Sequence, residues 1–353
     1  MSTPDIEHKE LSEDVLLKAR RATCNQQIDL MVKRMLIPFL GAGVNLAHRP
    51  PEAKFCPGGP YLPNASELSE NIAATFDYPW CDKSLLRVAW YATATQGNGK
   101  DGKDHAFGKD VLRYYLHEVF SKSYPWNKVH QFFARLPRKL KEKGYPNRHP
   151  LIVTTNYDRL LERAFDEEEE PYDVVSYGEY SDEETGESRD EKRKNPVPGF
   201  KHTPYNKDPD KREPKFLFSS NEFIAPVDRT IILKIHGAAD RESWERSSFV
   251  ITEDDYIDYL ALRVPDQIPA TLKKRMLHSR FLYLGYSLGD WNFRVLLRTI
   301  KARSLFDERS WAIMNRHEEW DPDYWEEHKV RLDKCELNDY IDILTEQLEK
   351  WRP

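Results

Sequence analysis

Short apolar runs alternate with longer stretches of helical spacing along this chain. The apolar runs predict buried strands at 35–40, 151–153, 231–235, 281–284 and 311–314. Apolar residues three and four apart predict helices at 11–33, 68–76, 85–91, 111–120, 132–140 and 159–165, from Asp290 onward, and at 337–348. Such alternation predicts an α/β fold, a Rossmann-like parallel sheet with helices on both faces.

The pattern predicts a single domain over residues 1–353. Between residues 45 and 149 several helices follow one another, joined by links rich in Pro and Gly, which indicates a large helical insertion. Residues 178–214 are dense in charge, Pro and Gly, which favours an exposed excursion.

Composition limits the class of protein. A hydrophobic fraction of 39% is enough for a substantial core, and a net charge of -6 gives no reason to expect nonspecific nucleic-acid binding. The four cysteines include no C-x-x-C pair, so no metal site is expected. Isolated cysteines, a polar amino terminus and no membrane-length apolar run together predict a soluble, cytoplasmic protein without membrane contact.

Polar clusters follow four of the predicted strands. They lie at 41–45, 154–158, 236–237 and 285–292. Because ligands bind at the carboxyl ends of strands in open parallel sheets, we expect the four clusters to meet in one crevice.

Two of the clusters have structural as well as functional interpretations. Gly41-Ala42-Gly43 can admit a diphosphate or simply form a tight turn, and Leu46 stands where a dehydrogenase fingerprint has its third glycine. In the second cluster, Asn156 can orient water or ribose hydroxyls, whereas Thr, Asn and Asp side chains also cap helices.

The other clusters leave similar alternatives. His236 suits a general base, and it can equally be an ordinary structural histidine. Ser287 can hold phosphate or ribose while Asp290 and Asn292 close the site, or the segment is a glycine turn with an Asp cap. Gly-x-Ser-x-Gly around Ser287 also matches a nucleophile elbow, with histidines further along the chain. Thr252 and the acidic residues after it fit a helix start better than a metal site.

The clusters together resemble a sirtuin-like domain, of the zinc-free bacterial type found in antiphage defence systems. The matching segments occur in the family's order, at 41–45, 155–158, 234–237, 252–256 and 285–292. The two cysteine pairs of the zinc ribbon of protein-deacylating sirtuins are missing, which weighs against an acyl-lysine substrate.

The resemblance implies a Rossmann-like NAD site and an NAD hydrolase that releases nicotinamide and ADP-ribose, depleting NAD during antiphage defence. It makes Asn156 and His236 the catalytic residues. The implied NAD-binding residues are Gly41, Ala42, Gly43, Asn45, Thr155, Asp158, Gly285, Ser287, Asp290 and Asn292.

The resemblance also implies a homo-oligomer and a HerA-type ATPase as a separate partner, since this chain has no Walker A loop. The alternative is a non-catalytic NAD or ADP-ribose sensor within a larger defence assembly. Such a sensor would need neither Asn156 nor His236.

Overall fold

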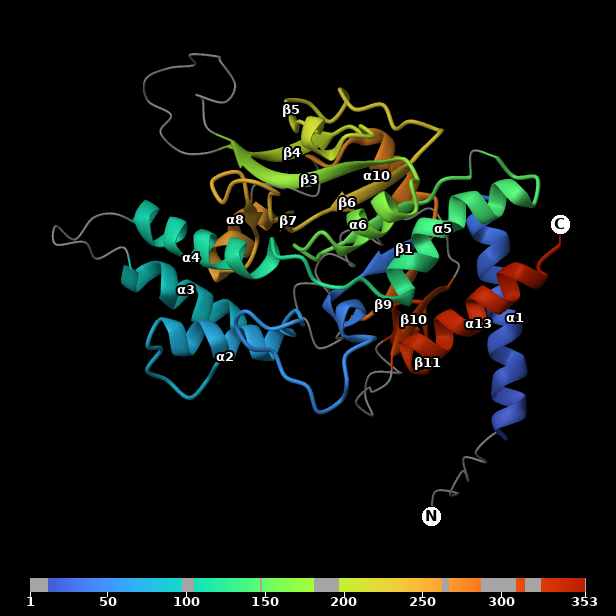
Figure 1. Cartoon of the computed structure of the whole chain (residues 1–353), viewed down its shortest axis with the longest axis horizontal. Coiled ribbons are helices and arrows are strands. Elements are labelled where there is room, and N and C mark those ends of the chain that lie inside the picture. The colour runs from blue at the N-terminus through green and yellow to red at the C-terminus, as the bar shows by residue number, and fades with distance from the viewer. Residues whose placement is uncertain are drawn as a thin grey trace, which may run out of the picture.

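One mixed sheet runs through the protein (Figure 1). The computed structural model describes residues 12–96, 105–146, 148–180, 197–261, 267–286, 309–314 and 325–352. Nine strands form the sheet in the order β11-β10-β9-β1-β2-β6-β3-β4-β5. The strands from β11 to β3 are parallel to their neighbours, and β4 and β5 add an antiparallel edge.

The strands of this sheet, and a separate β7–β8 pair, have the following bounds: β1 Leu36–Leu40, β2 Leu151–Thr154, β3 Tyr172–Tyr180, β4 Val197–Thr203, β5 Lys215–Leu217, β6 Thr230–Lys234, β7 Gly237–Ala238, β8 Ser248–Phe249, β9 Arg280–Leu284, β10 Ser310–Met314 and β11 Val330–Lys334. The five strands expected from apolar runs are β1, β2, β6, β9 and β10. The expected parallel sheet is therefore confirmed, and the strands β3, β4, β5 and β11 extend it.

The helices have these bounds: α1 Glu13–Val32, α2 Ala65–Thr75, α3 Leu85–Gln96, α4 His105–Phe120, α5 Lys128–Glu142, α6 Leu160–Glu167, α8 Glu253–Ala261, α10 Ala270–Leu277 and α13 Leu337–Lys350, with short 3-10 turns η1 Ala42–Leu46 and η2 Pro209–Lys211. The helix expected from Asp290 lies outside the described residues. In the part of the chain that the structure describes, no helix has the length and apolar character to cross a bilayer.

Strand order places the reversal of the sheet between β1 and β9. The six strands β6-β2-β1-β9-β10-β11 follow the order 3-2-1-4-5-6 of a dinucleotide-binding sheet, counted along the chain. The chain moves outward from β1 through β2 to β6 and later returns to the other side of β1 with β9. The crevice at the carboxyl ends of β1 and β9 is therefore the place where such a sheet binds its ligand.

Both faces of the sheet are covered by helices. In β1, Leu36 and Leu40 pack with α1, α5, α6 and α13, whereas Ile37 and Phe39 pack with α8 and α10 on the opposite face. Successive side chains of a strand point to opposite faces, so an entirely apolar strand is expected only where both faces are buried. The predicted layering is thus confirmed.

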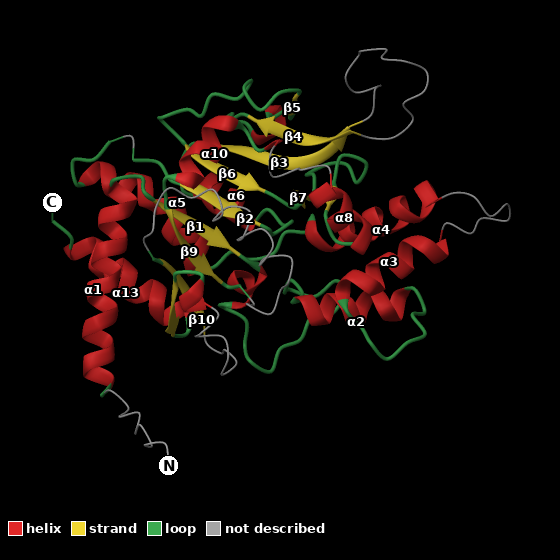
Figure 2. Cartoon of the chain, turned by 180° about the vertical axis from the view of Figure 1, so that it is seen from behind, coloured by secondary structure: helices red, strands yellow, loops and turns green. Residues whose placement is uncertain are grey.

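The four helices expected between residues 45 and 149 form two groups. Helices α2, α3 and α4 build a hydrophobic cluster of their own with the loops beside the sheet. Figures 1 and 2 show them at the end of the molecule opposite to α1 and α13. Helix α5 instead packs in the layer that covers the sheet, through Phe132, Phe133 and Leu136.

The charged segment 178–214 differs from its expected exposed excursion in the two stretches that join the sheet. Its first residues belong to β3, and β4 places Phe200 in the core at 1% exposure. Phe200 packs on Tyr177 of β3, with ring centroids 6.2 Å apart. A strand near a sheet edge needs few apolar residues. The overall composition of segment 178–214 is dominated by charge, so these few residues do not stand out in the sequence. Residues 181–196 lie outside the described residues.

Candidate functional site

Two glycine turns interlock at the reversal of the sheet. The N–H of Gly41 donates to the carbonyl of Leu284 at 2.9 Å, and the N–H of Gly43 donates to that of Gly285 at 2.8 Å. Gly285 has a φ of +68°, and a Cβ there would lie 2.2 Å from the nitrogen of Val44. Only glycine permits both this backbone conformation and this close approach. Ala42, between the two glycines of the first turn, is exposed.

Asn45 and Asp158 join the first glycine turn to the loop after β2. The Nδ2 of Asn45 donates to Oδ2 of Asp158 at 2.7 Å, and both residues are buried, at 7% and 5% exposure. The other carboxylate oxygen of Asp158 accepts the N–H of Leu160 at 3.0 Å, at the start of α6. Asp158 thus satisfies the first backbone N–H of α6 from one position before the N-cap residue Arg159.

Asn156 is left available for chemistry by this arrangement. Its Nδ2 donates to the carbonyl of Gly41 at 3.1 Å, which orients the amide against the glycine turn. Among the described residues no hydrogen bond is made by its Oδ1, and the side chain is half-buried. The amide oxygen is an acceptor that can serve a ligand. Next to it, the hydroxyls of Thr155 and Tyr286 lie 2.6 Å apart and connect the loops after β2 and β9.

His236 follows β6 and is buried, at 5% exposure. Its ring packs edge-on against Tyr256 and Tyr259, with centroids 5.4 Å and 5.7 Å away, and its Nδ1 lies 3.5 Å from the Tyr256 hydroxyl. Burial lowers the pKa of His236 to about 4. The imidazole is therefore neutral at pH 7, and its low pKa makes it a weaker base than a solvent-exposed histidine.

Asn156 and His236 leave neighbouring strands at matching positions. Thr154 of β2 pairs with Lys234 of β6, and each candidate residue comes two positions later. Because neighbouring parallel strands lie about 4.8 Å apart, both loops start from adjacent points at one edge. The two catalytic candidates thus leave neighbouring strands at one edge of the sheet, and Asn156 is bonded to the first glycine turn.

Comparison with known proteins decides the family. Residues 150–332 match the SIR2-like domain family. The chain belongs to the SIR2-like domain family. The matched region includes Asn156, Asp158, His236 and Gly285, and this confirms the sirtuin-like resemblance at the level of the family.

This SIR2-like chain is also similar to the NAD(+) hydrolase ThsA of Bacillus cereus (strain MSX-D12). The two are 23% identical over 262 residues, which cover 73% of this chain and 41% of that protein. The chain thus spans about two fifths of the length of this curated relative.

Some predicted residues of the SIR2-like site are not placed. Ser287, Asp290 and Asn292 lie outside the described residues, as does most of the segment around the Gly-x-Ser-x-Gly match. The residues Thr252 and Asp255 do start α8, where the Asp255 N–H donates to the Thr252 hydroxyl at 3.0 Å. Within the described ranges no group of three or more His, Cys, Asp or Glu side chains is placed to hold a metal ion.

Sequence reasoning missed a buried ion pair beneath the site. The Nζ of Lys234 lies 2.8 Å from Oε1 of Glu162, and the two side chains are 1% and 5% exposed. The same Nζ donates to the carbonyl of Asp158. The available signal was a single lysine in an otherwise apolar strand, because a buried charge requires a partner. Of the two tyrosines that pack against His236, Tyr256 lies at the end of the matching segment 252–256, whereas Tyr259 had no signal in the sequence.

Proposed function

We propose that this SIR2-like chain hydrolyses NAD at the nicotinamide–ribose bond, forming nicotinamide and ADP-ribose. The observation that carries the proposal is the junction of strand ends. There Asn156 bonds to the first of two interlocked glycine turns, and His236 leaves the neighbouring strand. Membership of the family and similarity to an NAD(+) hydrolase support it.

In this proposal the glycine turns hold the NAD diphosphate. The small residues of the first turn, Gly41, Ala42 and Gly43, allow the diphosphate to approach the backbone. The hydrogen bond between Asn45 and Asp158 keeps this turn in place. Asn156 and Asp158 are assigned to the nicotinamide ribose, and Thr155 is assigned to the NAD site beside them. Gly285, Ser287, Asp290 and Asn292 are assigned to the adenosine side.

The chemistry follows from the charge changes of the reaction. Water attacks C1′ of the nicotinamide ribose, the C–N bond breaks, and its electron pair leaves with neutral nicotinamide. Asn156 positions the water and ribose hydroxyls through its side-chain oxygen Oδ1, and His236 accepts the proton that water or a ribose hydroxyl releases. The nicotinamide group is already positively charged in NAD and leaves as a neutral molecule, so cleavage of the C–N bond needs no Lewis acid. We therefore propose that the protein uses NAD as its substrate and needs no metal.

Turnover of NAD by the full chain tests the proposal. The reaction is run with and without lysate from phage-infected cells, because the enzyme can require activation. We expect chromatography to detect nicotinamide and ADP-ribose. Asn156→Ala and His236→Ala are expected to lower the rate about 100-fold or more. His278→Ala and Asn221→Ala replace exposed residues of the same types and serve as controls. Wild-type rates in both site variants would refute the assignment.

A non-catalytic sensor of NAD or ADP-ribose is the second candidate. The burial of His236 between two tyrosines favours it, because a general base must reach water. If the chain is a sensor, it binds NAD or ADP-ribose, and the turnover experiment yields no nicotinamide with or without lysate.

The cellular role is a further part of the proposal. We propose that the chain acts in the cytoplasm as a homo-oligomer, with a HerA-type ATPase partner, and depletes NAD during antiphage defence. The family resemblance supports this, and the mass of the chain in solution, alone and with such an ATPase, tests the assembly.

A further inference from the structure

The segment 252–256 belongs to the sirtuin-like pattern but has no role in the proposed NAD site. Its last residue, Tyr256, lies near the start of α8 and packs its ring edge-on against His236, with centroids 5.4 Å apart. Tyr259, one turn later in α8, packs in the same way with centroids 5.7 Å apart. Since His236 is 5% exposed, the groups that touch its ring decide which of its two nitrogens carries the hydrogen.

The two tyrosines differ in what their hydroxyls contact. The Tyr256 hydroxyl lies 3.5 Å from Nδ1 of His236, and the Tyr256 side chain is half-buried. The Tyr259 hydroxyl is buried and forms no hydrogen bond with the residues that the structure describes. Within the same ranges Nε2 of His236 forms no hydrogen bond either. A separation of 3.5 Å is long for a hydrogen bond, and such contacts of catalytic groups often shorten when substrate binds.

A hairpin brings α8 back to His236. The N–H of Val250 donates to the carbonyl of His236 at 3.0 Å, and Gly237 of β7 pairs with Phe249 of β8. Helix α8 begins soon after β8, so the pairing of the two short strands places Tyr256 beside His236.

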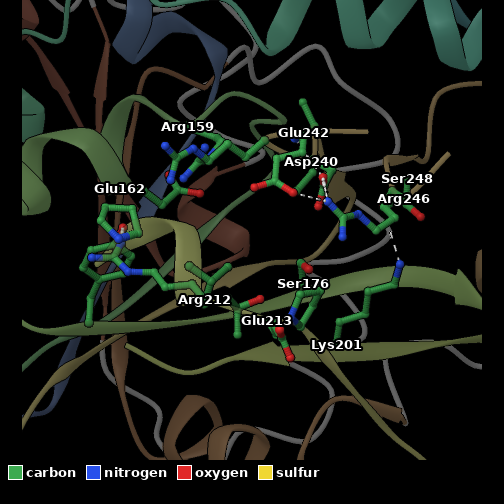
Figure 3. Close-up of a pocket in the computed structure, with 18 of the residues that line it drawn as sticks. Arg159, Glu162, Ser176, Lys201, Arg212, Glu213, Asp240, Glu242, Arg246 and Ser248 are labelled. Atoms are coloured by element: carbon green, nitrogen blue, oxygen red, sulfur yellow. Dashed lines mark hydrogen bonds and ion pairs between the residues drawn. The ribbon is translucent and has the colours of Figure 1, made fainter. Parts of the chain in front are cut away.

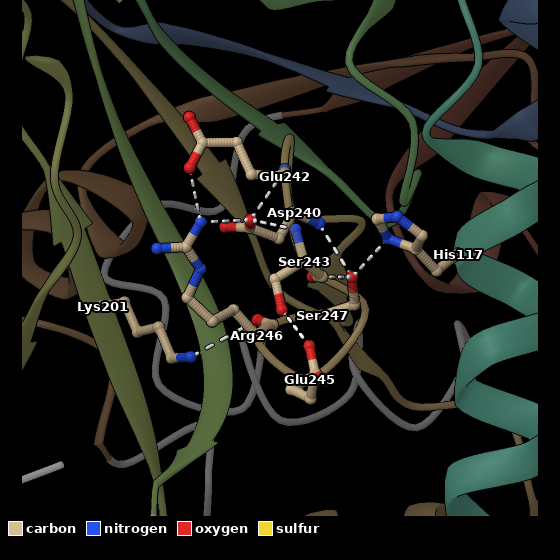
Figure 4. Close-up of polar contacts among 8 residues, drawn as sticks. All are labelled: His117, Lys201, Asp240, Glu242, Ser243, Glu245, Arg246 and Ser247. Carbon is tan, nitrogen blue, oxygen red and sulfur yellow. Dashed lines mark hydrogen bonds and ion pairs between the residues drawn. The ribbon is translucent and has the colours of Figure 1, made fainter. Parts of the chain in front are cut away.

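The turn between β7 and β8 is closed by its own hydrogen bonds. Oδ1 of Asp240 accepts the N–H groups of Glu242 and Ser243 at 3.0 Å each (Figure 4). The Ser247 hydroxyl accepts the N–H of Asp240 at 2.9 Å and lies 3.0 Å from Nδ1 of His117 in α4. These contacts hold the hairpin in one shape and tie it to the helical insertion.

The first turn of α8 is held just as firmly. Oδ2 of Asp255 accepts the N–H groups of Ile251 and Thr252 at 3.2 Å and 2.9 Å. The N–H of Tyr256 donates to the carbonyl of Thr252 at 3.2 Å, and Nζ of Lys109 in α4 lies 3.6 Å from Oδ1 of Asp255. The backbone that carries Tyr256 therefore has a fixed position relative to His236.

A cavity along the same hairpin leaves this contact undisturbed. The cavity measures about 220 Å³, and Asp240, Arg246 and Ser248 of the hairpin line it (Figure 3). Its described lining residues include neither His236 nor Tyr256. The polar groups of the cavity therefore do not compete with the Tyr256 hydroxyl for Nδ1.

We infer that the Tyr256 hydroxyl accepts a hydrogen bond from Nδ1–H of His236 and thereby leaves Nε2 as the nitrogen that takes up the proton. The direction of this bond rests on the proposed hydrolysis of NAD. A tyrosine hydroxyl can donate to a ring nitrogen or accept from it. If it donated, the tyrosine would occupy the lone pair of Nδ1 and the hydrogen of the neutral ring would be on Nε2, so neither nitrogen would be open to a proton from water or ribose. Tyr256 is thus a positioning residue that acts through His236.

NMR of the full chain with ¹⁵N-labelled histidine tests the inference without NAD. The signals of His236 are identified as those missing from the spectrum of His236→Ala. At pH 7 we expect Nδ1 protonated and Nε2 unprotonated in the wild type. Tyr256→Phe keeps the ring and removes the hydroxyl, and we expect Nε2–H to become the main form. Tyr259→Phe removes the hydroxyl of the other tyrosine and is the matched control, which should keep the wild-type form.

Turnover of NAD measures the consequence for the reaction. Tyr256→Phe should lower kcat about tenfold, as the loss of one hydrogen bond does, and leave KM within about twofold.

An Nε2–H form in the wild type overturns the inference, and this holds whether or not the variants fold. The wild-type ratio of the two forms in a folded Tyr256→Phe variant overturns it as well. If the wild type has the Nδ1–H form but turns over no NAD with or without lysate, the proposed hydrolysis fails while the hydrogen bond to Tyr256 stands.

Discussion

Lys234 connects the two loops that carry the candidate catalytic residues. It lies two residues before His236, donates to the carbonyl of Asp158, and pairs with Glu162 of α6. An unpaired charge at this depth would be strongly unfavourable, so the lysine and the glutamate depend on each other. The pair therefore positions the loop of Asn156 relative to the strand of His236.

Lys234→Met is expected to lower the free energy of unfolding by about 3–5 kcal/mol, because it leaves the Glu162 carboxylate buried without a partner. The double variant Lys234→Met, Glu162→Leu should recover much of this loss in urea denaturation. NAD turnover should stay low in both, since the Asp158 carbonyl has lost its donor in each. Lys350→Met, which removes an exposed ion pair with Glu346, should leave the urea midpoint close to that of the wild type. Equal turnover in the double variant and wild type would contradict the positioning role.

Turns between elements decide the shape of the site more than the strands themselves. The turn after β9 approaches the 3-10 turn after β1 so closely that a Cβ on Gly285 would lie 2.2 Å from the Val44 nitrogen. Gly144, which follows α5, also has a positive φ, of +89°, but has no atom within 4 Å of a built Cβ. A comparison of alanine substitutions at Gly144 and Gly285 therefore separates the cost of the left-handed backbone from the cost of the steric clash.

Gly144→Ala should cost about 1–3 kcal/mol, from the left-handed backbone alone. Gly285→Ala has the same strain and must also push the two turns apart, so we expect a larger loss of stability and no NAD turnover. Thermal unfolding and chromatography of the products measure both effects. If the two variants lose equal stability and both keep turnover, the contact between the turns is unimportant for the site.

Over the whole molecule, buried neutral histidines make the fold sensitive to acid. Burial lowers the pKa of His130 to about 3 and that of His236 to about 4, from 6.5. Nδ1 of His130 also accepts the N–H of Asn127 at 3.2 Å at the start of α5, a bond that protonation removes. Unfolding exposes both rings, which then bind protons at pH values where the folded protein does not.

Stability should therefore be fully present above pH 6.5 and fall as the pH drops toward 4. At pH 5 each of these histidines is expected to cost about 2 kcal/mol of unfolding free energy relative to pH 7. Urea denaturation at pH 7, 6 and 5 measures the loss. His130→Asn should flatten the pH dependence, whereas the same slope in that variant would show that His130 contributes nothing.

The fold class could be predicted from the sequence because its main strands are buried on both faces. Strand β1 is a continuous apolar run for that reason, β6 is apolar from Ile231 to Leu233, and the short length of such runs distinguishes them from helices. Edge strands escaped prediction. In β11 only Val330 is buried, so the segment has no apolar run to detect.

The sequence by itself determined that polar clusters follow four buried strands, because each apolar run is long enough to recognise and ends directly at polar residues. Only the tertiary structure decided that β1 lies between β2 and β9, which joins the two glycine turns and ties Asn156 to Gly41. The ion pair between Lys234 and Glu162 and the lowered pKa of His236 also belong to the folded state. Both arise from removal of charge from water, and the depth of burial depends on segments far apart in the chain.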